Sequence, residues 1–102
     1  MTTDKLSFGL KESTITKINN IFSLYPSIDK VVLYGSRAKG NYRNGSDIDL
    51  TIFGEVTYSQ LNQIETQLDD LLLPYTIDLS LFNQMDNVDL IDHINRVGKV
   101  FY

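Results

Sequence analysis

Apolar side chains recur along this chain with two different periods, one helical and one extended. Apolar residues three and four positions apart, the helical spacing, run through residues 10–22, 58–72 and 88–97. Short β-branched or alternating runs, the pattern of strands, lie at residues 30–34, 47–53 and 75–82. Glycine and proline stand at most boundaries between these segments, where chain breakers belong.

This order of elements, α-β-loop-β-α-β-α, predicts an α/β (α+β) fold, a small mixed sheet of about three strands with helices packed on it. Gly98 follows the last helical segment, where a C-cap glycine would stand, and residues 100–102 are expected to dock back on the body. The length of 102 residues supports a single domain over residues 1–102, without a linker or an internal repeat.

The amino-acid composition excludes several kinds of functional site. The chain has no cysteine, which excludes disulfides, thiolate metal sites and a cysteine nucleophile. The single histidine, His93, excludes a multi-histidine metal site, and we expect it to be a structural or surface residue rather than a catalyst. No apolar run approaches the roughly 18 residues of a membrane span. Residues 1–5 also lack the apolar core of a signal peptide, so we expect a cytoplasmic protein that does not bind membranes.

The balance of basic and acidic residues limits the kinds of molecule that the protein is expected to bind. Nine basic residues against thirteen acidic ones give a net charge of −4. Direct nucleic-acid binding is not expected, because release of counterions from a polynucleotide needs a basic surface. A small nucleotide remains compatible with this balance, since a few local cations and a metal ion are enough to hold it.

Three aspartates occupy matching polar positions of the predicted strands. Asp47 and Asp49 project from the same strand face with Cα atoms about 6.6 Å apart, and Asp78 has the equivalent place in the third strand. If the strands pair, the three carboxylates converge and need a cation to offset their repulsion. Oxygen ligands favour Mg²⁺ or Mn²⁺, which in pairs support phosphoryl or nucleotidyl transfer. The alternative is a half-buried strand that exposes its polar face to water.

A glycine–serine turn follows the first buried strand. Gly35 permits close approach of a phosphate to the backbone, and the Ser36 hydroxyl adds a donor. Arg37, Lys39 and Arg43 place three cations within seven residues, which suits a triphosphate. The alternative is a polar turn whose basic residues aid solubility.

Taken together, Gly35–Ser36, ten intervening residues and then Asp47-Ile48-Asp49 resemble the signature of the minimal nucleotidyltransferases. These belong to the DNA polymerase β-like nucleotidyltransferase superfamily, and Asp78 fits the third carboxylate of that superfamily. The likeness runs over roughly residues 30–102 and includes the closing segment, residues 94–102.

The resemblance implies a nucleotidyltransferase that binds ATP with Mg²⁺, or Mn²⁺ in its place, and moves AMP onto a hydroxyl. By position, Asp47 and Asp49 would be metal ligands. Asp78 would help to bind a second metal ion or draw the proton from the acceptor.

The same resemblance implies that Ser36 and the Gly35 backbone hold the distal phosphates, with Arg37 and Lys39 beside them. Minimal members commonly pair with small helical HEPN-domain proteins as toxin–antitoxin systems. The chain would then be an antitoxin that adenylylates a HEPN-type toxin, on a tyrosine in some pairs. Acceptor recognition would come from the partner or from a second subunit, which leaves both a homodimer and a hetero-oligomer open.

Two other functions compete with this one. The first is a non-catalytic module that binds a nucleotide and neutralises or regulates its partner by binding alone. The second is an interaction domain whose acidic strand face is only solvated. In the first, neutralisation of the partner should survive the loss of Asp47 and Asp49, whereas the enzyme requires them. In the second, replacing the aspartates with Asn should neither stabilise the metal-free protein nor abolish a Mg²⁺-dependent rise in melting temperature, both of which a metal site predicts.

Overall fold

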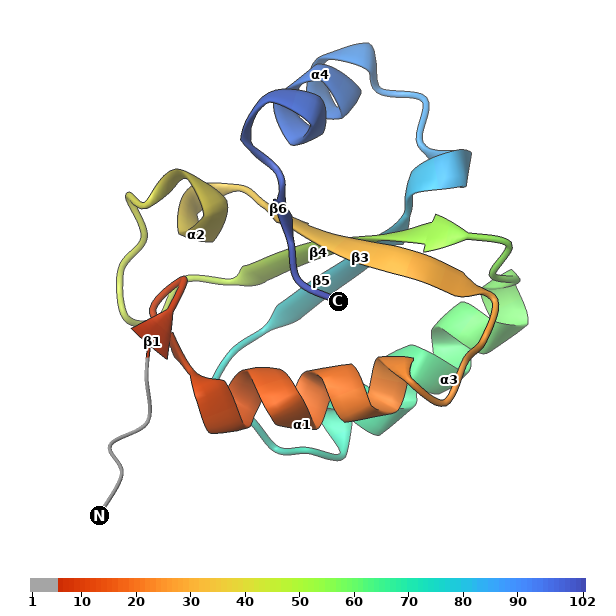
Figure 1. Cartoon of the computed structure of the whole chain (residues 1–102), viewed down its shortest axis with the longest axis horizontal. Helices are drawn as coiled ribbons and strands as arrows, with labels where there is room; N and C mark the ends of the chain where they lie inside the picture. Colours follow the sequence, from red (N-terminus) through yellow and green to blue (C-terminus); the bar gives the residue numbers. More distant parts are fainter. Residues whose placement is uncertain (1–5) are drawn as a thin grey trace.

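The computed structural model describes residues 6–102, whose centre is a mixed four-stranded sheet (Figure 1). Residues 1–5, where the sequence lacks a signal-peptide core, lie outside the described residues. The strand order is β5-β4-β3-β6, in which β3 pairs antiparallel with both neighbours and β4 pairs parallel with β5. The strands are β3 (Ile28–Tyr34), β4 (Ile48–Gly54), β5 (Ile77–Leu81) and β6 (Lys99–Val100).

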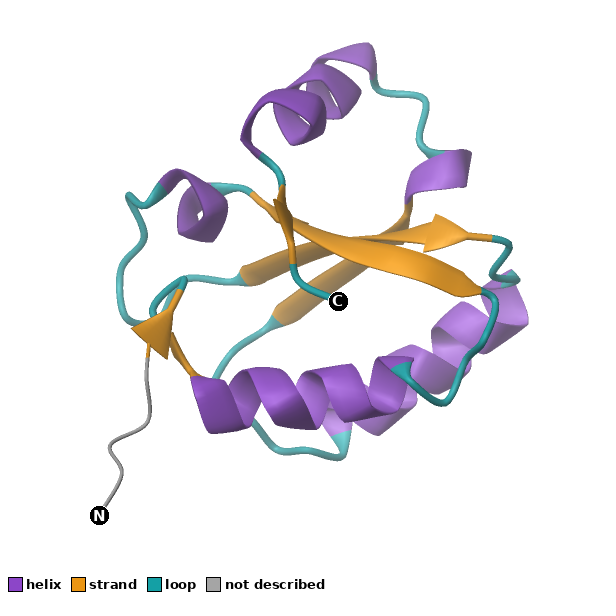
Figure 2. Ribbon diagram, in the orientation of Figure 1, coloured by secondary structure: helices purple, strands orange, loops and turns teal. Residues whose placement is uncertain are grey.

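Helices cover the two faces of this sheet unequally (Figure 2). On one face lie α1 (Glu12–Phe22) and α3 (Tyr58–Asp69), and on the other lies α4 (Val88–Val97). The four-residue α2 (Ser36–Lys39) follows β3, and the 3-10 turn η1 (Phe82–Gln84) follows β5. A small hairpin, β1 (Leu6–Ser7) and β2 (Leu10–Lys11), precedes α1. None of the helices in residues 6–102 is long and apolar enough to cross a membrane.

The alternation in β4 decides which face becomes the main core. Ile48, Leu50 and Ile52 are at most 1% exposed and belong to the cluster that contains the apolar stripes of α1 and α3. The intervening residues face the other side, where Val32 and Tyr34 of β3 pack with α4 in a smaller cluster. The main core therefore lies between the sheet and the α1–α3 layer, which leaves the other face available for polar residues.

The sheet has four strands rather than about three because the end of the chain adds β6. Lys99 pairs with Leu33, and Phe101 is buried in the main core, which confirms that residues 100–102 dock back on the body. Gly98 is not a left-handed C-cap, since its φ is −58°. Its small size serves close packing instead, because a Cβ there would lie 2.7 Å from Cγ1 of Val32.

Most element boundaries lie within a few residues of those expected. The helix expected over residues 10–22 begins at Glu12, because residues 10–11 form the second strand of the hairpin. The strand expected over residues 75–82 is shorter, at Ile77–Leu81. The largest difference is α2, a single helical turn inside the segment expected to be a loop.

A buried arginine organises this α2 segment. Arg37 is 2% exposed, and its guanidinium donates to main-chain carbonyl oxygens. Nε and Nη2 donate to Ser46 O at 3.1 and 2.9 Å, Nη1 donates to Phe8 O at 2.9 Å, and Nη2 also reaches Asn44 O at 3.3 Å. One side chain thus joins the N-terminal hairpin to the loop that leads into β4.

Two tyrosine rings complete the environment of this guanidinium. Its Cζ lies 5.3 Å from the ring centroid of Tyr42 and 5.0 Å from that of Tyr75, distances typical of cation–π contacts. A buried cation is costly unless its donors are paired, and here hydrogen bonds and aromatic faces offset that cost. Arg37 therefore stabilises the loop that carries the chain from α2 to β4.

Replacing Arg37 with Met tests this structural role. The substitution leaves buried carbonyl oxygens without donors, so we expect the free energy of unfolding to fall by about 2–4 kcal/mol. Urea denaturation monitored by circular dichroism measures the change. The matched control is Lys39→Met on the same helical turn, where the exposed side chain predicts a change within about 0.5 kcal/mol. Equal stability of the two variants would contradict the role given to Arg37.

Candidate functional site

Two of the predicted aspartates lie side by side on neighbouring strands. Asp49 and Asp78 are register partners in the parallel β4–β5 pair, so their side chains project from the same face of the sheet with Cα atoms about 4.8 Å apart. This is the face that carries α4 rather than the α1–α3 layer. Asp47 precedes β4 by one residue and is exposed. The structure thus brings Asp49 and Asp78 together, with Asp47 at the entrance to the strand.

The glycine–serine turn lies directly against Asp49. Tyr34 is the register partner of Asp49 across the β3–β4 pair, and the chain turns at the next residue, Gly35. Gly35 has φ +75° and ψ −155°, a conformation that favours glycine. A Cβ at this position would collide with the Asp49 carboxylate. Only glycine therefore lets the turn approach so closely, and Ser36 follows it as the partly exposed first residue of α2.

Several negative charges lie close together at the site and contribute to its shifted pKa values. Partial burial raises the pKa of Asp49, and the nearby charges of Asp78 and Asp47 raise it further, whereas His93 lowers it. Burial also raises the pKa of Tyr34, opposed by a hydrogen bond with Ser80, while Asp78 and Asp49 add to the increase. In both groups the charges of neighbouring carboxylates add to the larger effect of burial, and a bound cation would offset the part that is due to those charges.

The carboxylates suit a magnesium ion that completes its ligand shell from the substrate. Among residues 6–102, no three acidic or histidine side chains already form a cluster that could hold a metal ion. Mg²⁺ is commonly held by one or two carboxylates together with substrate phosphates and water, rather than by a cage made only of protein ligands. Asp49 and Asp78 provide the two adjacent carboxylates, and Asp47 lies close enough to act on the pKa of Asp49.

The basic residues divide into two groups with different roles. The expectation that Arg37 lies beside the phosphates does not agree with its position, since its guanidinium is buried and bound to main-chain carbonyls. The charge cluster in the sequence could not reveal this, because the carbonyls come from the hairpin and from the end of the loop. Lys39 and Arg43 are exposed and remain free to meet an anion from solvent.

His93 is the site residue that sequence reasoning missed. Its Nε2 accepts a hydrogen bond of 3.1 Å from the backbone N–H of Gly35, and its ring meets Tyr34 edge-on with centroids 6.3 Å apart. Helical spacing indicates only that His93 borders the apolar face of its helix, not which group it meets. His93 lies three residues after Leu90 and beside Ile94, on the border of the apolar stripe that packs α4 onto the sheet.

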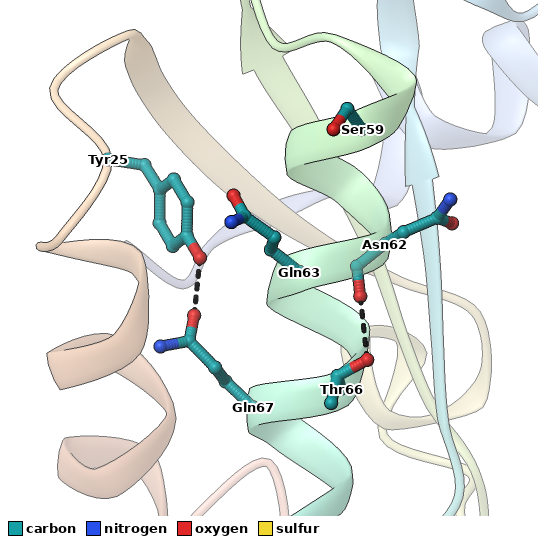
Figure 3. A pocket seen from close by; sticks show the side chains of 6 residues that line it. All are labelled: Tyr25, Ser59, Asn62, Gln63, Thr66 and Gln67. Carbon is teal, nitrogen blue, oxygen red and sulfur yellow. Dashed lines mark hydrogen bonds between the residues drawn. The ribbon is translucent and has the colours of Figure 1, made fainter.

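A polar groove on the other side of the molecule is distinct from this site. It has a volume of about 490 Å³ and lies between the end of α1 and one face of α3 (Figure 3). Tyr25 donates a hydrogen bond to the side-chain oxygen of Gln67 there, and Thr66 donates to the Asn62 carbonyl at 3.0 Å. The groove holds no carboxylate or lysine, so it offers no acid–base or phosphate chemistry.

Replacing Asp49 with Asn should stabilise the metal-free protein at neutral pH. A carboxyl whose pKa is raised by folding contributes stability below its unfolded pKa, and that contribution is lost as pH rises through the folded pKa. The advantage of Asn should therefore be absent well below the ordinary Asp pKa of 3.8 and should develop as pH rises above it. We expect a melting temperature a few degrees higher at pH 7, measured in chelator by differential scanning calorimetry.

The matched control for this variant is Asp29→Asn. Asp29 is an exposed aspartate of β3 that lies outside the site, so its replacement with Asn removes the same charge from the chain. The structure indicates that the carboxylates of the site repel one another. Equal gains in stability for Asp49→Asn and Asp29→Asn at pH 7 would contradict this repulsion.

The chain is similar to known proteins both in sequence and in fold. A curated Methanocaldococcus jannaschii protein, provisionally named as a protein adenylyltransferase, is 32% identical over 93 residues, which cover 83% of this chain and 90% of that protein. A crystal structure of a toxin–antitoxin with AMP-PNP superimposes with a TM-score of 0.69 at 22% identity, over 91% of this chain and 73% of that one.

A second structure of the same fold is that of a tri-AMPylated Shewanella oneidensis HEPN toxin in complex with MNT antitoxin. It superimposes with a TM-score of 0.66 at 18% identity, over 89% of this chain and 71% of that one. The family model described as polymerase beta, nucleotidyltransferase matches residues 16–102, which include most of α1, the whole four-stranded sheet and the carboxylate site. The chain therefore belongs to the polymerase beta nucleotidyltransferase family and is a nucleotidyltransferase.

Proposed function

We propose that this nucleotidyltransferase moves AMP from ATP onto a hydroxyl, a tyrosine hydroxyl in particular, of a small helical HEPN-type protein and so acts as its antitoxin. The adenylyl group is supported by the name of the M. jannaschii relative and by the AMP-PNP of the first structural neighbour. The acceptor is supported by the second neighbour, where a HEPN toxin is AMPylated in complex with its antitoxin.

The observation that carries the proposal is the position of Asp49. This carboxylate is next to Asp78 on one side and in contact range of the Gly35 turn on the other. A triphosphate held at the turn would bring its α-phosphate towards the carboxylate pair, where bound cations act. In a merely solvated strand face, nothing would require a glycine packed against the acid.

Asp49, Asp78 and Asp47 are the residues that would hold Mg²⁺, or Mn²⁺ in its place. The ion would supply positive charge beside the phosphates and favour the departure of pyrophosphate. The chain's own groups would bind the remaining anion: the Ser36 hydroxyl at the start of α2 would face the distal phosphates, and Lys39 supplies an exposed cation. The N–H of Gly35 is not available to the phosphates as expected, because it donates to Nε2 of His93.

The transfer itself forms one bond and breaks another. The acceptor oxygen attacks the α-phosphorus, the bond from that phosphorus to the bridging oxygen of the β-phosphate breaks, and pyrophosphate leaves with the electron pair. The acceptor proton passes to a carboxylate. Asp78 suits this step better than Asp49, because its side chain is exposed at the sheet's β5 edge, where an incoming protein can reach it.

The proposal predicts AMP transfer that depends on the paired carboxylates. Incubated with Mg²⁺ and ATP labelled at the α-phosphate, the protein should label the HEPN-type partner that is supplied with it. Asp49→Asn and Asp78→Asn should each slow labelling by at least about 100-fold. Mass spectrometry should find the added AMP on a tyrosine of the partner.

The control is Asp70→Asn, which removes an exposed aspartate at the end of α3 and should label the partner as fast as the wild type. If the protein binds ATP and neutralises its partner without labelling it, and does so equally well in Asp49→Asn, it is a nucleotide-binding module. That result would replace the proposed enzyme.

Metal dependence is a separate prediction. With AMP-PNP present, Mg²⁺ should stabilise the wild type by about 2.7 kcal/mol at a hundredfold excess over its Kd. Asp49→Asn and Asp78→Asn should lose most of this gain, since each removes one of two adjacent ligands. Thermal unfolding with and without chelator measures it, with Asp70→Asn again as control. Equal gains in all four proteins would contradict a metal site at these carboxylates.

A further inference from the structure

The hydrogen bond between α4 and the glycine–serine turn joins residues far apart in the chain. The N–H of Gly35 donates to Nε2 of His93 at 3.1 Å, and the two residues are 58 positions apart. An accepting Nε2 carries no proton, so the proton of the neutral ring is on Nδ1. The bond is partly buried, where water competes for the donor less than it does at an open surface.

The turn needs such a partner because its backbone is unusual. Gly35 leaves β3 with φ +75° and ψ −155°, outside the region that strands and helices use. Its N–H points away from the β3–β4 ladder, whose last register pair is Tyr34 and Asp49. His93 supplies the acceptor that the ladder does not, and so stabilises the conformation in which Asp49 packs against the turn.

The position of His93 is itself fixed by packing. The next residue, Ile94, is 3% exposed and packs with Val32 and Tyr34 of β3, which anchors this part of α4 on the sheet. The imidazole also lies edge-on to the Tyr34 ring. A helix held in this way presents the imidazole to the turn at a defined distance, and helix packing itself does not need a nitrogen at that point.

We propose that His93 is a positioning residue of the nucleotide site. Through Nε2 it holds the Gly35 amide, and with it the Gly35–Ser36 turn, in the conformation that receives the distal phosphates beside Asp49. His93 touches neither the α-phosphate nor the acceptor in this role, so its contribution is to nucleotide affinity rather than to the chemical step. The inference rests on the proposed function, since it names a further residue of the same site.

The test compares two replacements of the imidazole. Phe fills a similar volume without an acceptor, whereas Gln places a side-chain oxygen near the position of Nε2. We expect His93→Phe to raise the KM for ATP about tenfold with kcat within about twofold, the effect of one lost hydrogen bond. His93→Gln should recover most of the affinity. Arg96→Ala, which removes an exposed ion pair with Asp92 on the same helix, should leave both constants unchanged.

A second measurement does not depend on catalysis. In protein labelled with ¹⁵N, a scalar coupling across the hydrogen bond should connect the Gly35 amide nitrogen with Nε2 of His93 and vanish in His93→Phe. The dissociation constant of Mg²⁺–AMP-PNP, followed on the Gly35 resonance, should rise in the same proportion as the KM. If AMP transfer is absent but the coupling and the affinity loss are observed, the proposed enzyme fails and the positioning role stands.

Any of three results would overturn the role of His93. One is the absence of the coupling in the wild type. A second is a His93→Phe variant that binds Mg²⁺–AMP-PNP as tightly as the wild type. A loss of kcat at unchanged KM would also contradict it, because a residue that only positions the phosphate turn acts on binding.

Discussion

Parallel pairing of β4 with β5 is the constraint on which the site depends, because it holds Asp49 and Asp78 at the same level on adjacent strands. Two carboxylates so placed repel each other, and the partial burial of Asp49 adds to the cost, as the raised pKa of that group shows. The rest of the fold has to offset this unfavourable arrangement. The main core does so on the opposite face of the sheet, where the buried residues of β4 pack against α1 and α3.

Around the carboxylates, the backbone is placed by long-range contacts rather than by local structure. On one side, the Arg37 guanidinium binds the carbonyls of the hairpin and of the loop before β4, which fixes the path of the chain into Asp47. On the other side, α4 brings His93 to the amide of Gly35. The turn is thus held from both ends, and a phosphate would meet a backbone that is already ordered, which lowers the entropic cost of binding.

The unequal layers of the fold also separate stability from chemistry. The α1–α3 side carries the large apolar cluster and the neutral polar groove of Figure 3. The α4 side carries the charged groups, a smaller apolar cluster and the exposed edge of β5 next to Asp78. A partner that presents a hydroxyl to the carboxylates would approach this second side, where docking does not require the main core to open.

Local patterns in the sequence were sufficient to predict the main helices and strands and to select the aspartates and the glycine–serine turn as candidate site residues. Apolar periods of 3.6 and 2 follow from helix and strand geometry alone, so they predicted the three longest helices, the three longest strands and the shared face of the aspartates. The glycine–serine turn and its distance along the chain from Asp47 and Asp49 were likewise visible in the sequence. Strand β6 was not, because two residues are too few to show a period and their pairing with β3 depends on Phe101 entering the core.

Tertiary structure decided which of those residues meet. The register that places Asp78 beside Asp49, the burial of Arg37 and the bond from Gly35 to His93 each join segments that are distant in the chain. No local pattern encodes such pairs, since they depend on how whole layers pack. An arginine in a basic cluster looks the same whether water or main-chain carbonyls surround it, and a lone histidine on a helix looks the same whether it faces solvent or a turn. Only the packing of the folded chain distinguishes these surroundings, because it determines which hydrogen-bond partners a side chain keeps once water is excluded.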